Sequence, residues 1–325
     1  MKKLFFGIIT LLLLAACTGT GEQNQTSYEK VSPDFCADSA FAYIEAQCAF
    51  GPRTMNSAAH DSCALWIERQ FKRLGCEVST QDAELTLYDG TKVNSRNIIA
   101  RINPQAAQRI IICSHWDSRP WADHDSDEAN HRTPIAGAND GASGVGVLIE
   151  LARMMQKQAP PVGIDLVCFD AEDCGTPQWA DDGDDHQDTW CLGSQYWAQN
   201  PHADATTFRY AILLDMVGGA NSIFRKEAFS MRNAPRVVDH VWSVGQSLGY
   251  TDLFLSEEGG GVTDDHLQII NAGIPAIDII ANNSEEGYGF NATWHTVGDT
   301  PANIDRHVLQ AVGQTVAEVI FLSQP

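Results

Sequence analysis

The chain is long and strongly acidic: 325 residues carry 21 Lys and Arg against 42 Asp and Glu, a formal charge of −21. Nucleic-acid binding requires Lys and Arg to neutralise phosphates, so this charge argues against it, and it disfavours anionic membrane surfaces for the same reason. With 44% hydrophobic residues and eight tryptophans, the chain needs a packed core and is not disordered. The length suits one large α/β domain or two small ones.

The N-terminus has the pattern of a signal peptide. Lys2 and Lys3 precede an apolar run over residues 4–14. That run is too short to span a bilayer but has the length of a signal-peptide core. We therefore predict a signal peptide over residues 1–16.

The next residue, Cys17, follows Leu-Ala-Ala, which resembles the bacterial lipobox, where cleavage before the cysteine accompanies lipidation of its sulfur. A plain secretory signal with an incidental Cys17 is the alternative. We expect a lipidated flexible tether over 17–32 and a single catalytic domain over 33–325. The protein would then be lipid-anchored in the bacterial cell envelope, held to the membrane by this lipid only, with its domain in the periplasm or at the cell surface.

Beyond the tether, apolar strands alternate with amphipathic helices. Helices are predicted over residues 33–50, 57–74, 141–155, 235–248, 265–271 and 304–322. Strands are predicted over residues 77–87, 93–102, 109–113, 164–169, 210–214 and 275–280. Such alternation is typical of an α/β domain with a mixed, mostly parallel central sheet covered by helices on both faces. Without an internal repeat or a Pro- or Ser-rich linker, one domain is expected.

Imidazole and carboxylate groups recur where these strands end. The set comprises His115, Asp117, Glu172, Asp173, Asp215 and Asp278, joined by Asp140 before a helix and by His295. Ligands of open α/β sheets bind beyond the carboxyl ends of the strands. Ligands at such wide sequence spacing suit a catalytic zinc better than a structural one. Alone, Asp140 would be a turn residue and His115 a core histidine, so the prediction depends on the whole set.

The order of these residues resembles a known family. The matching motifs are His115-x-Asp117, Gly137-Ala138-Asn139-Asp140-Gly141-Ala142-Ser143, Glu172-Asp173, Asp215, Asp264-Asp265-His266 and Trp294-His295-Thr296. Together they resemble the zinc aminopeptidase family M28, and within it the glutaminyl cyclases of the animal and bacterial type. The resemblance runs from Asp34 to the C-terminus and implies a zinc aminopeptidase-like fold.

The resemblance also implies roles for individual residues. The zinc ligands would be Asp140, Asp173 and His295, and the general acid/base would be Glu172. In the peptidases a second zinc adds His115 and Asp215, with Asp140 bridging, and all of these positions are filled here. The cofactor is therefore one Zn²⁺ per chain for a cyclase, or two for an aminopeptidase.

Two activities are compatible with this set. A glutaminyl-peptide cyclotransferase, an acyltransferase, converts the N-terminal glutamine of peptides and proteins to pyroglutamate and releases ammonia. An M28 aminopeptidase removes N-terminal residues instead. A third possibility, an inactive peptide-binding lipoprotein, predicts a damaged site, whereas all ligands and the base are present.

Further residues favour the cyclase. The cyclases resemble one another in carrying a tryptophan where Trp294 lies, and another near Trp179, so both are candidate substrate-binding residues. Asp264 matches an acidic partner of the substrate amide, and Asp215 would share a proton with Glu172. Two departures keep the peptidase open. Asp278 replaces a histidine of the animal cyclases in the same network, and Asp173 replaces a glutamate.

Two other features leave alternatives open. Cys113 and Cys168 lie in apolar strands and are expected to be buried thiols, while Cys174 and Cys191 bracket an acidic loop and form a possible disulfide. Within that loop, residues 181–185 hold four acids around a glycine. They could bind calcium, but a solvated loop is favoured because the closing glutamate of an EF-hand is missing.

Overall fold

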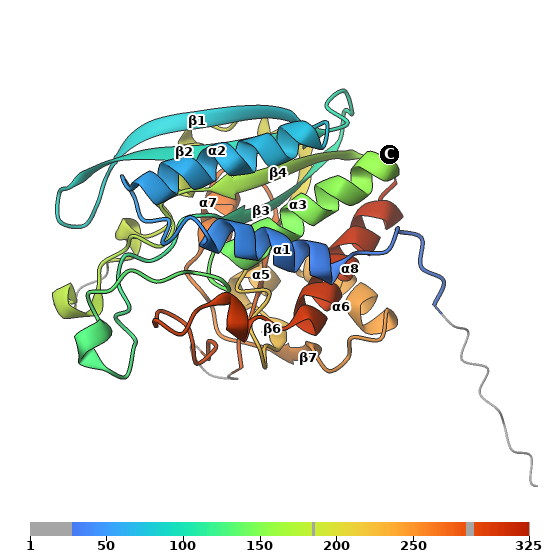
Figure 1. The fold of residues 1–325 in the computed structure, drawn as a ribbon. Coiled ribbons are helices and arrows are strands. Elements are labelled where there is room, and N and C mark those ends of the chain that lie inside the picture. The colour runs from blue at the N-terminus through green and yellow to red at the C-terminus, as the bar shows by residue number, and fades with distance from the viewer. Residues whose placement is uncertain (1–27, 184–185, 284–288, 325) are drawn as a thin grey trace, which may run out of the picture.

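The computed structural model describes residues 28–183, 186–283 and 289–324 (Figure 1). A six-stranded sheet forms its centre, with strand order β1-β2-β4-β3-β5-β8. The strands are β1 Glu77–Thr86, β2 Lys92–Ile102, β3 Arg109–His115, β4 Gly163–Phe169, β5 Phe208–Asp215 and β8 Ala276–Ile280. The β1–β2 and β2–β4 pairs are antiparallel, and β4, β3, β5 and β8 run parallel to one another. The predicted mixed, mostly parallel sheet is confirmed.

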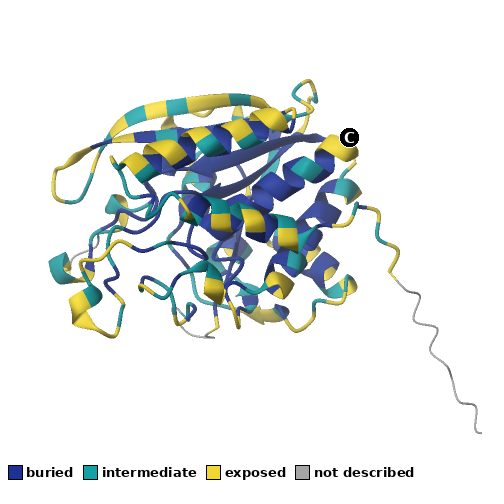
Figure 2. Cartoon of the chain, viewed as in Figure 1, coloured by how far each residue is buried: buried dark blue, intermediate teal, exposed yellow. Residues whose placement is uncertain are grey.

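Burial changes across this sheet. Every residue of β3 and β4 is buried, whereas β1 alternates between exposed and half-buried positions at the edge. In Figure 2 the central strands are accordingly dark blue, and the β1–β2 hairpin is mostly yellow and teal. Strands buried on both faces are continuous apolar runs, which is why the sequence identified β3 and β4 so clearly.

Helices cover both faces, as predicted. Alternate residues of β3 separate two cores: Ile110 and Ile112 face one, Ile111 and Cys113 the other. The larger core packs against α1 Ala37–Cys48, α2 Ala58–Arg73, α3 Ala142–Lys157, α6 Pro235–Ser247 and α8 Arg306–Leu322. The smaller core packs against α4 Leu192–Gln199 and α7 Asp265–Asn271.

Several short elements were not predicted. They are α4, α5 Ala228–Asn233, and a small two-stranded sheet of β6 Phe224–Lys226 with β7 Phe254–Glu258. Each is too short for a hydrophobic period to be distinguished from chance. Helix ends were predicted better: Ser57 accepts a hydrogen bond from the His60 N–H at the start of α2, and Gly75, with φ of +81°, follows its end.

The boundary between tether and domain needs correction. The predicted tether extended to residue 32, but residues 28–32 pack onto α8. Buried Glu318 of α8 accepts hydrogen bonds from the Tyr28 hydroxyl at 2.9 Å and from the Ser32 N–H at 2.8 Å. Burial, followed by the hydrogen bond to Glu318 and the Glu318 charge, raises the pKa of Tyr28 to about 12. The folded domain therefore begins by residue 28. The predicted signal peptide, Cys17 and the rest of the predicted tether lie outside the described residues.

The possible Cys174–Cys191 disulfide is not formed in this structure. All eight cysteines of the described ranges are free, and Cys113 and Cys168 are buried as expected. The Cys174 and Cys191 thiols point toward different carboxylates, Asp117 at 3.7 Å and Glu172 at 3.3 Å. Among the described residues, no helix has the length and apolar character needed to cross a membrane.

Candidate active site

A cavity of about 420 Å³ opens at the carboxyl ends of the parallel strands. Six of the predicted polar site residues line it: Asp140, Glu172, Asp173, Asp215, Asp264 and His295. The apolar part of its wall is formed by Trp190, Met216, Val262, Ile280, Phe290 and Trp294. The sheet has therefore gathered residues from five separate segments, as expected for a ligand site in an open α/β fold.

Asp140, Asp173 and His295 form the first candidate metal set, since their ligand atoms lie within 4.8 Å of one another. His295 Nε2 is 3.1 Å from Asp173 Oδ1 and 3.5 Å from Asp140 Oδ2. Asp140 Oδ2 and both Asp173 oxygens are buried without a hydrogen-bond partner. Two carboxylates and an imidazole that leave other positions open are the donor set of a catalytic zinc, so these residues fit the metal.

The electrostatics agree with that fit. Burial and the nearby Arg119 guanidinium lower the pKa of His295 well below its usual value, which keeps the imidazole neutral, the form that ligates metals. Burial and the neighbouring Asp140 charge raise the pKa of Asp173 well above its usual range. Two buried carboxylates side by side repel one another, and a divalent cation removes this cost.

A second candidate set shares Asp140 with the first. His115 Nε2 lies 3.0 Å from Asp140 Oδ1 and 3.2 Å from Asp215 Oδ1, and the three residues form a cluster with metal-ligand spacing. Burial lowers the pKa of His115, but its hydrogen bonds to the carboxylates of Asp117, Asp140 and Asp215 outweigh burial and raise it well above its usual value. The predicted two-metal alternative therefore has its residues in place, although His115 lies behind the cavity wall rather than lining it.

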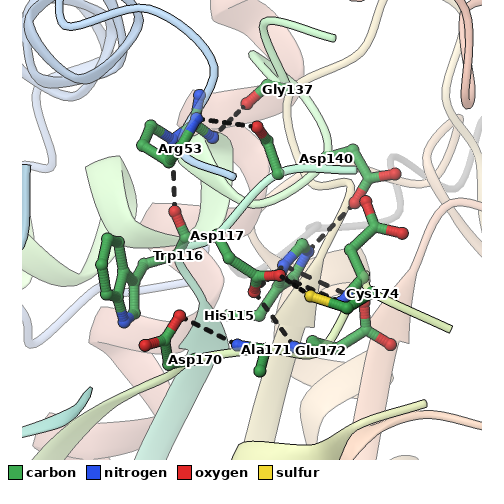
Figure 3. A network of polar contacts seen from close by, with 12 residues as sticks. Arg53, His115, Trp116, Asp117, Gly137, Asp140, Asp170, Ala171, Glu172 and Cys174 are labelled. Atoms are coloured by element: carbon green, nitrogen blue, oxygen red, sulfur yellow. Dashed lines mark hydrogen bonds and ion pairs between the residues drawn. The ribbon is translucent and has the colours of Figure 1, made fainter. Parts of the chain in front are cut away.

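Glu172 is the predicted general acid/base, and the backbone around it is fixed by Asp117. Asp117 accepts hydrogen bonds from the Glu172 and Asp173 N–H groups, both at 3.1 Å (Figure 3). This single carboxylate therefore orients the base and a metal ligand together. Burial raises the pKa of Glu172 well above its usual range, and the nearby Asp264 and Asp173 charges add to the effect while His115 opposes it. A carboxyl so placed can both accept and return a proton.

The loop that presents Asp140 depends on residues the sequence analysis missed. Buried Arg53 donates to the carbonyls of Gly137 at 2.8 Å and of Ala136. Buried Asp299 accepts from the Asp140 N–H at 3.0 Å. Gly141, with φ of +92°, closes the loop where a Cβ would lie 2.5 Å from the Asp117 carbonyl oxygen. Arg53 and Asp299 are far from Asp140 in the sequence, so only the Gly141 turn could have been noticed.

Asp264 and Asp278 are brought together beyond Asp215. Asp264 caps α7 and lines the cavity, while Asp278 is buried in β8 and does not line it. Burial and the Asp215 charge raise the pKa of Asp264 to about 7. Burial and the Asp264 charge raise that of Asp278 well above its usual range. These carboxylates are predicted to form one network, and in the structure the charge of one raises the pKa of the next. Of Asp264 and Asp278, only Asp264 lines the cavity where a ligand could contact it.

The aromatic wall differs in part from expectation. Trp294 lines the cavity and stacks on His295 with ring centroids 3.9 Å apart, as its adjacency to the ligand suggested. Trp179 does not line it and packs against Trp121 and the Arg132 guanidinium instead. The additional aromatic residue of the wall is Trp190, whose ring lies parallel to His295 at 6.0 Å. The role of Trp179 in substrate binding stays a prediction, and the geometry favours Trp190.

The acidic loop stands apart from this chemistry. Asp181 and Asp182 are exposed, as predicted for a solvated loop, and form a group with His186 at the rim of the cavity. Residues 184–185 of the same loop lie outside the described residues. The calcium alternative therefore stays a prediction.

Comparison with known proteins agrees with this geometry. A family model described as peptidase family M28 matches residues 97–320, more than half of the chain. A solved Zn-dependent exopeptidase from Parabacteroides distasonis is 50% identical, with a TM-score of 0.87 over 90% of this chain and 100% of that one. A glutaminyl cyclase from Bacteroides thetaiotaomicron, solved with bound N-acetylhistamine, is 48% identical, with the same TM-score and the same coverage of both chains.

Similarity extends to animal proteins. The chain is 27% identical over 254 residues to a glutaminyl-peptide cyclotransferase-like protein of Bos taurus, which covers 70% of this chain and 60% of that protein. It therefore spans less than two thirds of the length of this relative. The similar bacterial structures, by contrast, are matched along their whole length.

Proposed function

The chain belongs to peptidase family M28, and on this basis we propose that it is a zinc-dependent glutaminyl-peptide cyclotransferase. Its substrates are peptides and proteins with an N-terminal glutamine, its products pyroglutamate and ammonia. The observation that carries the proposal is one cavity that holds the buried base Glu172, the acidic Asp264 and a complete ligand set. Whole-length similarity to a bacterial glutaminyl cyclase supports it.

The chain's residues account for each proton in this reaction. Zinc held by Asp140, Asp173 and His295 would polarise the γ-carbonyl of the substrate glutamine. The substrate α-amine attacks the carbonyl carbon of the γ-carboxamide, the new C–N bond closes a five-membered ring, and Glu172 takes the proton that the amine loses. Glu172 then returns this proton to the γ-amide nitrogen, whose bond to carbon breaks as ammonia leaves.

The cavity wall supports this reaction by fixing one side chain. Trp190 and Trp294 border His295 and narrow the space beside the candidate metal set. Asp264, with its pKa raised to about 7, is available to hydrogen-bond the γ-amide nitrogen in either protonation state. Because nucleophile and electrophile belong to the same substrate residue, no activated water is needed.

One observation favours an aminopeptidase as the second candidate. The set His115, Asp140 and Asp215 has metal-ligand spacing and shares Asp140 with the first set. Two metals with a bridging carboxylate activate water against the first peptide carbonyl. We propose one zinc per chain, and the metal count is therefore part of the test.

The test compares two peptides that differ only in the first residue, glutamine or leucine. A cyclase releases ammonia from the Gln peptide, lowers the mass of that peptide by one ammonia, and leaves the Leu peptide intact. Elemental analysis should then find one zinc per chain. Free leucine and two zincs would identify the aminopeptidase. If zinc-loaded protein released neither ammonia nor leucine, the chain would be a peptide-binding protein without this enzymatic activity.

We further propose that the enzyme is a lipoprotein of the bacterial cell envelope, with its domain in the periplasm or at the cell surface. The support is the sequence around Cys17, which resembles a lipobox after a signal-like apolar run. Mass spectrometry of the N-terminal peptide from membranes should find Cys17 diacylated, and Cys17→Ser should release the protein from the membrane fraction. An unmodified Cys17 in a soluble mature protein would contradict this.

A further inference from the structure

The thiol of Cys191 lies directly against the base. Cys191 Sγ is 3.3 Å from Glu172 Oε1, and its residue is only 1% exposed. The ligand atoms of Glu172, Cys191 and Asp264 all lie within 4.8 Å of one another. The thiol therefore belongs to the same polar cluster as the base and the acidic residue proposed to contact the substrate amide.

The backbone holds Cys191 in that position at a cost. Its φ of +56° is in the left-handed region, which a residue with a Cβ rarely adopts. Ala171, next to the base, is in the same region with φ of +54°. Strained residues of this kind persist where the surroundings impose them, and they cluster at functional sites.

Several hydrogen bonds impose this conformation. The Cys191 N–H donates to the Glu172 carbonyl at 3.0 Å, and the Leu192 N–H donates to that of Ala171 at 3.0 Å. Asn97 then joins the two segments: its Oδ1 accepts from the Asp170 N–H at 3.0 Å and its Nδ2 donates to the Gly193 carbonyl at 2.9 Å. The turn that carries the base and the start of α4 therefore form one rigid unit.

A thiol suits a base that alternates between two protonation states. When Glu172 is ionised, the S–H can donate to Oε1; when Glu172 carries the proton, sulfur can accept from it. Being a weak partner in both directions, the thiol fixes the carboxylate without strongly favouring either state. Burial and the nearby Glu172 raise the pKa of the Cys191 thiol well above its usual value, so it keeps its proton and does not act as a nucleophile.

We propose that Cys191 is a positioning residue that orients the Glu172 carboxylate for proton transfer. This inference rests on the proposed function of Glu172 and deepens it, because it assigns the neighbour that holds the base in both states. Removal of the thiol should slow the chemical step and leave substrate binding nearly unchanged.

The experiment measures kcat and KM for a Gln-initiated peptide in wild type, Cys191→Ala, Cys191→Ser and the control Cys168→Ala. Cys168 is a fully buried thiol in β4 that packs in the hydrophobic core, so it matches the loss of a buried sulfur. We expect kcat to fall about tenfold in C191A with KM within about twofold, on the scale of one hydrogen bond. C191S should recover most of the activity, and C168A should keep the wild-type kcat. Should C191A fail to fold, Cys191→Gly removes the thiol and suits the left-handed backbone.

A double-mutant cycle completes the test. If Cys191 acts through Glu172, C191A should add almost no loss of kcat in the Glu172→Gln background. A full tenfold loss there, a wild-type kcat in C191A, or a C191S variant as slow as C191A would each overturn the inference. A wild-type protein that forms no pyroglutamate would instead overturn the proposed function, so the two failures are distinguishable.

Discussion

Buried charges gather at both ends of the parallel strands, but they are treated differently. Near the amino ends, Asp165 of β4 accepts from Arg109 Nε at 2.9 Å and lies 3.1 Å from His202 Nε2. Near the carboxyl ends, both oxygens of Asp173 and of Asp278 lack a hydrogen-bond partner. The first cluster is satisfied within the chain, whereas the second holds several carboxylates close together without enough protein donors.

The difference separates structural from functional burial. Burying a carboxyl group without a partner costs free energy and raises its pKa, and such groups cluster at functional sites. The paired cluster therefore serves stability, and the unpaired cluster forms the candidate metal and substrate site. Substitutions at the two ends should accordingly change different observables.

The largest effect is expected at the unpaired end. Glu172→Gln removes the proton acceptor while keeping the shape of the side chain, so kcat for ammonia release should fall by about 100-fold or more. The free energy of unfolding should stay the same or increase, because burial raises the pKa of Glu172 and its carboxyl therefore opposes folding at neutral pH. Kinetics alongside urea denaturation measure both. A variant that releases ammonia at the wild-type rate would exclude Glu172 as the base.

At the paired end, Arg109→Ala should show the reverse pattern. It leaves Asp165 with weaker compensation and is expected to lower the free energy of unfolding by about 4 kcal/mol. The matched control is Arg101→Ala: Arg101 lies 3.7 Å from the same carboxylate but is partly exposed, so its loss should cost about 1 kcal/mol or less. Below the unfolding transition, kcat of R109A should equal that of wild type. A loss of activity in folded R109A would contradict the claim that the Arg109–Asp165 pair serves stability alone.

Glu227 tests whether pairing, rather than location, decides stability. It lies near the unpaired end, but it accepts from the Phe229 and Ser230 N–H groups and contacts His266 at 3.3 Å. Although burial opposes ionisation, these partners lower its pKa from 4.5 to about 2. The stabilisation is therefore complete above about pH 4.5 and is lost as the pH falls through about 2.

Glu227→Gln should consequently lower the free energy of unfolding by about 3 kcal/mol at pH 7. The difference from wild type should shrink as the pH falls below about 4.5. Urea denaturation at pH 7, 4 and 3 measures this difference. A difference that does not change with pH would contradict the assigned pairing.

The smallest expected effect is on substrate binding, and it tests which tryptophan forms the wall of the cavity. Trp190→Ala opens the cavity wall beside His295, so KM for a Gln-initiated peptide should rise about tenfold. Trp179→Ala removes a ring that packs on Trp121 outside the wall, and KM should change by less than about twofold. Steady-state kinetics of both variants decide which tryptophan binds the substrate. The reverse ranking would restore Trp179 as the substrate-binding residue.

Sequence patterns anticipated the elements and ligands that depend on local order. The continuous apolar strands β3 and β4 predicted a buried sheet, and the polar residues at the strand ends predicted a site there. The resemblance to family M28 implied the ligand set Asp140, Asp173 and His295, whose ligand atoms the structure brings within 4.8 Å of one another. What could not be predicted depends on tertiary contacts. Arg53 and Asp299 stabilise the Asp140 loop from distant segments, and no local pattern marks either residue.

The expectations for the cysteines and for the aromatic wall differed from the structure for a related reason. Sequence spacing suggested that Cys174 and Cys191 could meet, but the left-handed backbone at Cys191 turns its thiol toward Glu172 instead. Similarly, Trp179 lies near the expected distance from the base in sequence, at a slightly longer spacing than in the animal cyclases, yet the structure places Trp190 beside His295. Direction of a side chain, rather than distance along the chain, was the missing information.

The free thiols have a consequence for how the protein is made. Because all eight cysteines of the described residues are unbonded, folding of this part of the chain requires no oxidation step and no disulfide isomerase. Refolding of the reduced chain from denaturant should therefore lack the slow shuffling phase that disulfide-bonded secreted proteins show. Six of these sulfurs are buried, so peroxide should reach them only when the domain opens. Oxidative inactivation would then report on unfolding of the domain rather than on its chemistry.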